Sequence, residues 1–331
     1  MLIFWIIVFI VALAVLVKSA DWLILSAEKI GFFIGLPSFI IGVTIVAVGT
    51  SLPELVSSLA AVFKGVPEVV AANVIGSNIA NILLIVGICG IIARRLVVKK
   101  SLIDLDLPLL AIGTILFLGV LWDRKVTFGE SLLMLITYSA YLLYSILDKK
   151  IDDHEETVID YSSKQWQKKK NLNLKKEKFI RPEISIKDFV MLIAGIAGLF
   201  YGAKYLIDAL VNLSSILNVP TGIITITTIA VGTSLPELLV SVKASFQKKS
   251  EIALGNIFGS NIFNALVVTG FSGLFRILPV DNQTFIIGLP TMALATLIFI
   301  ISGISRRIHI WEGLFYLAIY ILFIAKLFNW F

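Results

Sequence analysis

A nine-residue segment occurs twice in this chain, each time inside an apolar stretch. Residues 47–55 read Ala-Val-Gly-Thr-Ser-Leu-Pro-Glu-Leu, and residues 230–238 repeat them letter for letter. Each copy carries one glutamate, Glu54 or Glu237, in surroundings where a carboxylate is costly unless it is paired or binds a cation. Matching glutamates in two chain halves predict a cation site at the interface between two structural repeats.

The similarity between the two halves extends well beyond this segment. Pro37 matches Pro220 and Asn81 matches Asn264 at the same offset of 183 residues, with no gap between them. Agreement over this length without an insertion indicates an internal duplication. The two copies should therefore fold in the same way.

Apolar runs recur along nearly the whole chain. Charged residues make up only 15% of the 331 residues, the mean hydropathy is +0.97, and a helix needs about 20 apolar residues to cross a bilayer. These values exclude an ordinary soluble domain and predict an all-α polytopic membrane protein with ten transmembrane helices. We expect the spans at residues 2–26, 38–63, 68–92, 102–121, 127–147, 186–213, 220–245, 252–275, 283–303 and 309–329. Because no basic region precedes it, the first run is interpreted as a retained helix and not as a cleaved signal.

One hydrophilic segment divides the chain into two repeats of five helices. We place the first repeat at residues 1–147, the linker at 148–188 and the second repeat at 189–331. The linker holds too few hydrophobic residues to bury a core. Since five is an odd number of spans, the second repeat must enter the membrane from the opposite side, which gives the two repeats inverted topology.

The distribution of basic residues predicts the orientation of the chain. The net charge is +6, and most of the lysines and arginines fall in the linker or in short loops on the linker's side of the membrane. Basic loops stay in the cytoplasm. We therefore expect a multi-pass protein of the cell membrane with a cytoplasmic linker and both termini outside. The positive charge then reflects membrane topology and not nucleic-acid binding.

The repeated segment combines a helix-disrupting residue with hard oxygen ligands. Pro53 removes a backbone donor and should leave carbonyls of residues 47–49 free to face a ligand. Thr50 and Ser51 add hydroxyl oxygens, and Glu54 adds a negative charge. Oxygen ligands of this kind suit a dehydrated Na+ or Ca2+.

A second repeated motif places small polar residues on one helix face. Residues 73, 77 and 81 are spaced by four, and residues 256, 260 and 264 repeat the pattern. Gly76 and Gly259 should allow a neighbouring helix to approach closely. We interpret Asn81 and Asn264 as ligands. The other asparagines of the motif are interpreted as packing residues, and they are Asn73, Asn78, Asn256 and Asn261.

The charge of the predicted site limits which ions it can bind. Two ionised glutamates carry two negative charges, which one Ca2+ neutralises. An empty site should instead take up protons or several monovalent ions, because unpaired carboxylates are costly in a low dielectric. This behaviour favours antiport over a passive pore. With one cysteine and two histidines, the chain should hold no zinc site and needs no cofactor.

The paired Gly-Thr-Ser-Leu-Pro-Glu and Gly/Ala-Asn-x-x-Gly-Ser-Asn segments resemble the alpha-repeats of the cation/Ca2+ antiporter superfamily, in its Na+/Ca2+ exchanger branch. The resemblance is most specific at residues 42–81 and 225–264. It implies electrogenic exchange of three Na+ for one Ca2+ by alternating access, with two outer helices sliding against the helices of the site. The ligands that it implies are Glu54, Glu237, Thr50, Thr233, Ser51, Ser234, Ser77, Ser260, Asn81, Asn264 and the carbonyls of Ala47 and Ala230.

Several alternatives remain open at this point. Some relatives carry aspartate at the place of Asn264, and its absence here argues against K+ co-transport. A Ca2+/H+ exchanger, in which both glutamates carry protons, is the close alternative, and a cation channel is a more distant one. Since no catalytic pairing accompanies the motifs, we do not expect an enzyme. We expect Ca2+ and Na+ as substrates, the lipid bilayer as surroundings, and no obligatory protein partner.

Overall fold

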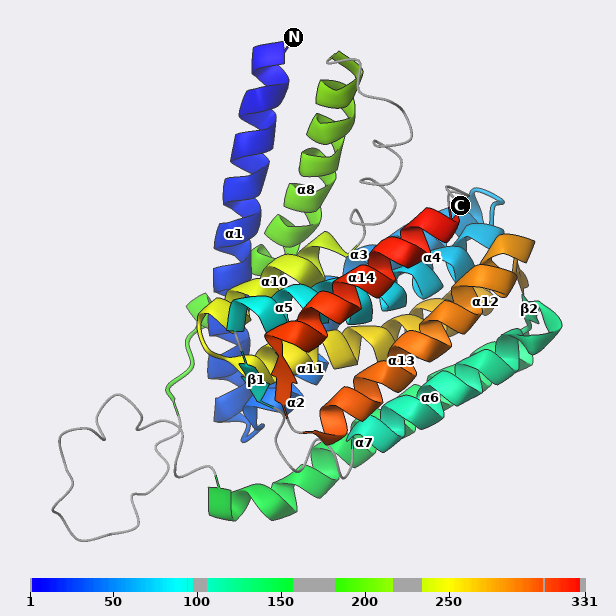
Figure 1. Cartoon of the computed structure of the whole chain (residues 1–331). Helices are drawn as coiled ribbons and strands as arrows, with labels where there is room; N and C mark the ends of the chain where they lie inside the picture. The colour runs from blue at the N-terminus through cyan, green and yellow to red at the C-terminus, as the bar shows by residue number, and fades with distance from the viewer. Residues whose placement is uncertain are drawn as a thin grey trace, which may run out of the picture.

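The chain folds almost entirely into helices (Figure 1). The structure is a computed structural model, and it describes residues 2–93, 95–97, 106–156, 182–216, 234–305 and 307–327. Four short segments within the described helices are π-helical turns, which widen the helix locally. Two short antiparallel ribbons connect loops from the two halves of the chain.

The described part of the first half contains five helices of 12 or more residues and several shorter ones, with a π-helical turn before α3 and another after α4. In chain order its elements are α1 (Leu2–Phe33), α2 (Ser38–Ile41), η1 (Gly42–Val46), α3 (Ala47–Phe63), α4 (Glu68–Ile79), η2 (Ala80–Ile85), α5 (Val86–Ala93), β1 (Arg95–Val97), α6 (Leu107–Val120), η4 (Leu121–Asp123), β2 (Lys125–Val126) and α7 (Phe128–Glu156).

The second half repeats this order. Its elements are α8 (Ile186–Ile216), α10 (Leu235–Phe246), α11 (Ser250–Ile262), η6 (Phe263–Val268), α12 (Thr269–Gly273), β3 (Leu278–Pro279), η7 (Thr284–Gly288), α13 (Leu289–Ile304), β4 (Arg307–His309) and α14 (Ile310–Leu327). The offset of 183 residues maps α1 onto α8, α4 onto α11 and the π-helical turn η2 onto η6. The duplication seen in the sequence is therefore present in the folded chain down to its irregular turns.

The two ribbons pair one strand from each half, and they are equivalents of each other. In the first ribbon Leu96 of β1 lies opposite Ile308 of β4. The repeat equivalent of Leu96 is Pro279 of β3, and the repeat equivalent of Ile308 is Lys125 of β2. These two residues are partners in the second ribbon. Figure 1 shows β1 and β2 at opposite ends of α13. The two ribbons thus contain the same pair of repeat positions with the halves exchanged.

Equivalent helices also pack against each other in opposite directions. In α8, Gly195 contacts Leu23 of α1 and Gly202 contacts Leu16, so the two helices run antiparallel (Figure 1). Likewise Gly303, at the end of α13, packs on Leu107 at the start of α6. Within the described chain, each of these helices is antiparallel to its own repeat equivalent.

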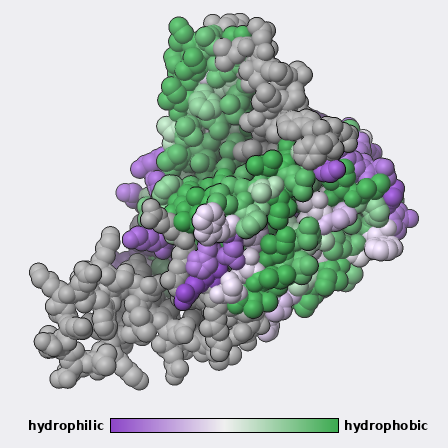
Figure 2. Space-filling model, viewed as in Figure 1, coloured by the Kyte–Doolittle hydropathy of each residue, from purple (hydrophilic) through white to green (hydrophobic). Residues whose placement is uncertain are grey.

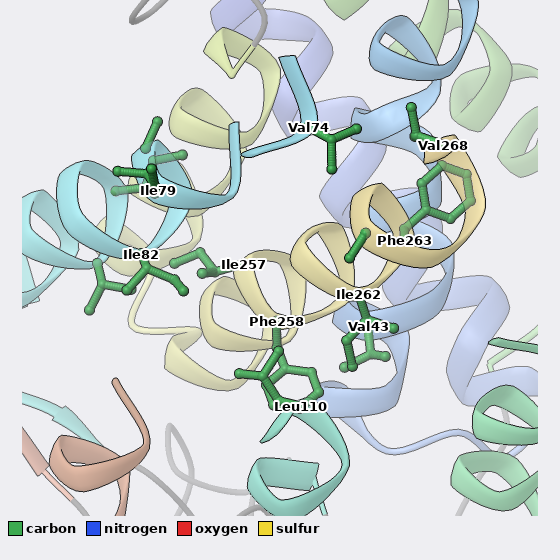
Figure 3. Packing of buried hydrophobic residues seen from close by; sticks show 14 of the residues in the cluster. Val43, Val74, Ile79, Ile82, Leu110, Ile257, Phe258, Ile262, Phe263 and Val268 are labelled. Carbon is green, nitrogen blue, oxygen red and sulfur yellow. The ribbon is translucent and has the colours of Figure 1, made fainter. Parts of the chain in front are cut away.

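The core lies between the helices that carry the repeated motifs. Figure 3 shows Phe258 and Ile257 of α11 packed among side chains from other elements, including Val43, Ile82 and Leu110. The rings of Phe39 and Phe258 are 5.9 Å apart in an edge-to-face arrangement. This packing fixes α11 at the centre of the molecule.

Glycines bring two of the central segments into direct backbone contact. A methyl group on Gly259 would lie 2.6 Å from the Cβ atom of Ala47, and one on Gly42 would lie 2.8 Å from the carbonyl oxygen of Ile252. The close approach expected at Gly259 is therefore confirmed. Around Gly76 no described residue lies within 4 Å of the equivalent position.

Seven helical segments are long and apolar enough to cross a membrane, as counted over the described residues. They are Leu2–Phe33, Ser38–Phe63, Glu68–Ala93, Ile186–Leu213, Ser250–Gly273, Thr284–Ile304 and Ile310–Leu327. Figure 2 shows hydrophobic residues over most of the coloured part of this face, with hydrophilic residues gathered in a few patches. The chain is a multi-pass membrane protein.

The other three expected spans are not among these seven segments. Of the span expected at 102–121, residues 102–105 lie outside the described chain and α6 covers Leu107–Val120, while the span expected at 127–147 continues to Glu156 at the end of α7. This helix thus extends into the segment predicted to be linker. Of the span expected at 220–245, the structure describes the part that forms α10, while residues 217–233 lie outside the described chain. Helix α1 also runs seven residues past its expected end, to Phe33.

Candidate functional site

The two repeated glutamates lie in helices from the two halves that contact each other, α3 and α10. Glu54 lies in α3 and Glu237 in the first turn of α10, and both side chains are 0% exposed. The carboxylates are close enough to interact electrostatically. Pro53 does not end its helix, because α3 continues through it. The irregular backbone lies just before, in η1.

Glu237 receives its hydrogen bond from the other half of the chain. The hydroxyl of Ser51 donates to Oε1 of Glu237 at 2.8 Å. No described residue donates to Oε2 of Glu237, or to either carboxylate oxygen of Glu54. Three buried carboxylate oxygens therefore lack a hydrogen-bond donor in the described chain, an arrangement that strongly disfavours an empty, ionised site.

Thr50 belongs to a network that holds the first motif against the second. Its hydroxyl donates to Oδ1 of Asn256 at 3.0 Å, lies 3.4 Å from Oγ of Ser260 and lies 3.2 Å from the carbonyl oxygen of Ala47. The amide of Asn256 in turn donates to Oγ of Ser241 at 2.9 Å. Asn256 thus orients Thr50 through its side chain.

Both predicted ligand asparagines lie in π-helical turns. Asn81 is in η2 and Asn264 is in η6, and both side chains are 0% exposed. Neither Oδ1 atom accepts a hydrogen bond from any described residue. Because π-helical turns widen the helix and change which way side chains point, they often occur at functional sites.

The other predicted ligands fall around these residues, with two exceptions. Ser77, Ser260 and Ser234 are buried, and Ala47 is 0% exposed. Thr233 and Ala230 lie outside the described residues, so their prediction is not tested by the structure. Every predicted ligand that is described is buried.

Ser58 and Ser241 were not among the predicted ligands. Each lies one helical turn after a repeated glutamate, at equivalent positions, and both are buried. Ser241 accepts from Asn256, while Oγ of Ser58 has no partner among the described residues. The signal available in the sequence was a hydroxyl four residues after the glutamate in both copies.

Buried oxygens suited to a hard cation lie on elements of both halves that contact each other, α3 with η6 and α10 with η2. Among the predicted ligands, five buried side-chain oxygens have no donor in the described chain: two from Glu54 and one each from Glu237, Asn81 and Asn264. In the part of the chain that the structure describes, no three His, Cys, Asp or Glu residues come together. A cation here would be held by two carboxylates and neutral oxygens, which is a ligand set for Na+ or Ca2+ and not for a soft metal.

A family model described as "Sodium/calcium exchanger protein" matches residues 4–147 and 187–329. The chain belongs to the sodium/calcium exchanger family. The match covers both repeats and omits the hydrophilic segment between them. Members of this family are transporters and not enzymes.

This exchanger is similar to curated proteins of nearly the same length. It is 32% identical to sodium/calcium exchanger MaX1 of Methanosarcina acetivorans, over 97% of each chain. It is 30% identical to putative antiporter CaxA of Alkalimonas amylolytica, over 94% of each chain. The two names describe exchange or antiport, and the second does not specify the ions.

Solved structures show the same fold. The sodium-calcium exchanger NCX_Mj soaked with zero Na+ and Ca2+ superimposes with a TM-score of 0.80 at 27% identity, covering 99% of this exchanger and all of the other chain. The form soaked with 2.5 mM Na+ and 0.1 mM Ca2+ gives a TM-score of 0.78 at 28% identity.

Proposed function

We propose that this exchanger moves Ca2+ across the cell membrane in exchange for Na+ by alternating access. The observation that carries the proposal is the group of five buried oxygens of Glu54, Glu237, Asn81 and Asn264 that lack donors among the described residues. Such a group is stable only when a cation or proton occupies it. The same oxygens cannot hold Ca2+ and Na+ at once, so the two ions should compete.

The charge of the site supports this pair of ions. Two carboxylates balance one Ca2+, and several Na+ ions replace it at the cost of using more of the neutral oxygens. We propose an electrogenic exchange of three Na+ for one Ca2+. The proposed ligands are Glu54, Glu237, Thr50, Thr233, Ser51, Ser234, Ser77, Ser260, Asn81, Asn264 and the carbonyls of Ala47 and Ala230.

We also propose ten transmembrane helices in two repeats of inverted topology. Support comes from the antiparallel packing of α1 on α8 and of α6 on α13, and from the exchange of strands between the two ribbons. With the basic linker in the cytoplasm, both termini lie outside. In this arrangement the site lies where the repeats meet, as inverted-repeat transporters require.

The coupling ion is tested by 45Ca2+ uptake into proteoliposomes. Vesicles loaded with Na+ are diluted into Na+-free choline buffer at clamped pH, and a second set receives a pH gradient without Na+. We expect uptake in the first set alone. Uptake that follows only the pH gradient would replace Na+ by H+ as the coupling ion and leave the Ca2+ site unchanged.

The variant Glu237→Gln provides the control for the site. It keeps the size of the side chain and its ability to accept from Ser51, but removes one of the two charges that balance Ca2+. Coupled uptake should fall to the level of empty vesicles, while the protein elutes as the wild type does in size-exclusion chromatography. Single-channel currents in place of saturable counterflow would contradict exchange altogether.

A further inference from the structure

Asn78 and Asn261 are repeat equivalents that contact each other. They lie in α4 and α11, and their numbers differ by the repeat offset of 183. Each side chain is only 2% exposed. Nδ2 of Asn78 donates to the backbone carbonyl of Asn261 at 3.1 Å. A residue that bonds its own equivalent must lie close to the axis that relates the repeats.

The hydrogen bonds around this axis run in one direction only. Asn81 donates from Nδ2 to Oδ1 of Asn261 at 3.4 Å, parallel to the bond from Asn78. If the two repeats exchanged conformations, Asn261 would donate to the backbone carbonyl of Asn78, and Asn264 would donate to Oδ1 of Asn78. Neither exists here: within the described chain, Nδ2 of Asn261, Nδ2 of Asn264 and Oδ1 of Asn78 all lack partners.

The same asymmetry is present at the side-chain amides of the two proposed ligands Asn81 and Asn264. A side-chain amide is planar and carries its oxygen and nitrogen on opposite corners, so a bond to the nitrogen fixes where the oxygen points. The amide of Asn81 is anchored through Nδ2 by Asn261, and its Oδ1 accepts nothing from the described residues. Among the described residues, Asn264 has no such anchor. One ligand amide is oriented and its equivalent is not.

We propose that Asn78 and Asn261 are positioning residues that orient one ligand amide at a time, and that the direction of their bonds reverses when the site turns to the other side of the membrane. This inference rests on the proposed function. In a transporter built from inverted repeats, the two facing states arise when the repeats exchange conformations. Bonds that run from α4 to α11 in one state must then run from α11 to α4 in the other.

The proposed reversal separates this role from simple packing. Residues that only fill space between α4 and α11 would affect both facing states alike when shortened. A pair that reverses should affect Ca2+ binding at one face of the membrane only. Asn261 supports Asn81 in the state seen here, and Asn78 supports Asn264 in the opposite state. The two matched variants should therefore weaken Ca2+ binding on opposite faces of the membrane.

The test measures exchange of 45Ca2+ against unlabelled Ca2+ in vesicles that hold the protein in one orientation. This reaction requires neither Na+ nor a pH gradient, so it does not depend on which ion is coupled. The half-saturating Ca2+ concentration is determined separately at the external and internal faces. The wild type is compared with Asn261→Ala and Asn78→Ala. A wild type that carries no Ca2+ would overturn the proposed function itself.

We expect each alanine variant to raise the half-saturating concentration about 3- to 20-fold on one face, and the two variants to affect opposite faces. Asn261→Asp keeps an oxygen that accepts from Asn81 and should retain more affinity than Asn261→Ala on the affected face. If Asn78→Ala does not fold, this comparison at Asn261 still tests the proposal. Equal effects of both variants on the two faces, or no difference between Asn261→Asp and Asn261→Ala, would overturn the inference.

Discussion

Asn256 makes three hydrogen bonds, and each reaches a different part of the candidate site. Its Oδ1 accepts from Thr50 at 3.0 Å, and its Nδ2 donates to Ser241 at 2.9 Å and to the backbone carbonyl of Glu237 at 3.4 Å. The side chain is 0% exposed. The amide thus ties α11 to both helices that carry a repeated glutamate.

Asn256→Ala should therefore weaken Ca2+ binding without removing any carboxylate. Loss of one to three hydrogen bonds within a membrane corresponds to a rise of about 3- to 20-fold in the half-saturating Ca2+ concentration. The measurement is 45Ca2+ uptake as a function of Ca2+ concentration. Asn282→Ala, at an exposed asparagine that accepts from Arg124, is the control and should match the wild type. An unchanged Ca2+ affinity in Asn256→Ala would show that the hydrogen bonds of Asn256 do not support the cation site.

At the residue scale, the sequence predicts which side chains gather but not how they bond. Glu54 and Glu237 were predicted from their position in identical segments. The same identity hides the differences between them, because nothing in two equal motifs shows that Ser51 donates to the carboxylate of Glu237 while no described residue donates to the carboxylate of Glu54. That difference depends on which conformation the two repeats adopt, and a symmetric sequence permits either.

Among the secondary-structure elements, α11 makes direct backbone contacts with several neighbours. Gly255 and Gly259 present its backbone to α2, η1 and α3, leaving no room for a side chain. Gly259→Ala should lower the free energy of unfolding by about 1–3 kcal/mol, since the added methyl group meets backbone that cannot move aside.

The measurement is the thermal unfolding temperature of the purified protein in detergent. Gly119→Ala, in α6, adds a methyl group where nothing described lies within 4 Å, and helix propensity alone should leave stability equal or slightly higher. A melting temperature for Gly259→Ala equal to that of Gly119→Ala would show that the contact with α3 is looser than described.

At the element scale, long periodic features were predictable and short ones were not. The apolar runs located most of the helices to within a few residues, because length and hydropathy are strong signals. The ribbons had no such signal: β2 and β3 are two residues long, too short for alternation to appear. The π-helical turns around Asn81 and Asn264 are also invisible in composition, since they depend on packing against neighbouring helices.

On the scale of the whole molecule, α1 and α8 form a pair that extends beyond the rest of the bundle (Figure 1). Ion pairs tie the lower half of α1 to its neighbours. Asp21 pairs with Lys243 of α10 at 3.1 Å, Lys29 pairs with Asp188 of α8 at 2.8 Å, and Glu28 pairs with Lys249. Two of these contacts connect the α1–α8 pair to α10 and to the residue before α11.

Movement of this pair relative to the site should therefore depend on Asp21. Asp21→Asn weakens its contact with Lys243 and should raise the maximal exchange rate about 2- to 5-fold, as expected from one partly exposed ion pair. The half-saturating Ca2+ concentration should stay within about twofold of the wild type, since Asp21 bonds no proposed ligand. Both values come from the same uptake curves.

Asp123→Asn provides a matched control for that change. It also removes one negative charge from an ion pair, with Lys125 at 3.7 Å, but at a loop remote in sequence from α1. The control should leave rate and affinity unchanged. A loss of Ca2+ affinity in Asp21→Asn, with no gain in rate, would place this residue in the support of the site and not in the movement of α1.

The most direct test of the account is equilibrium binding of 45Ca2+ to the purified protein in detergent, with Na+ as competitor. We predict that the wild type binds one Ca2+ per chain, that rising Na+ displaces it with a sigmoidal dependence, and that Glu54→Gln binds none while remaining folded. Glu54→Gln with wild-type Ca2+ binding, or bound Ca2+ that Na+ does not displace, would contradict a shared site at the repeated glutamates.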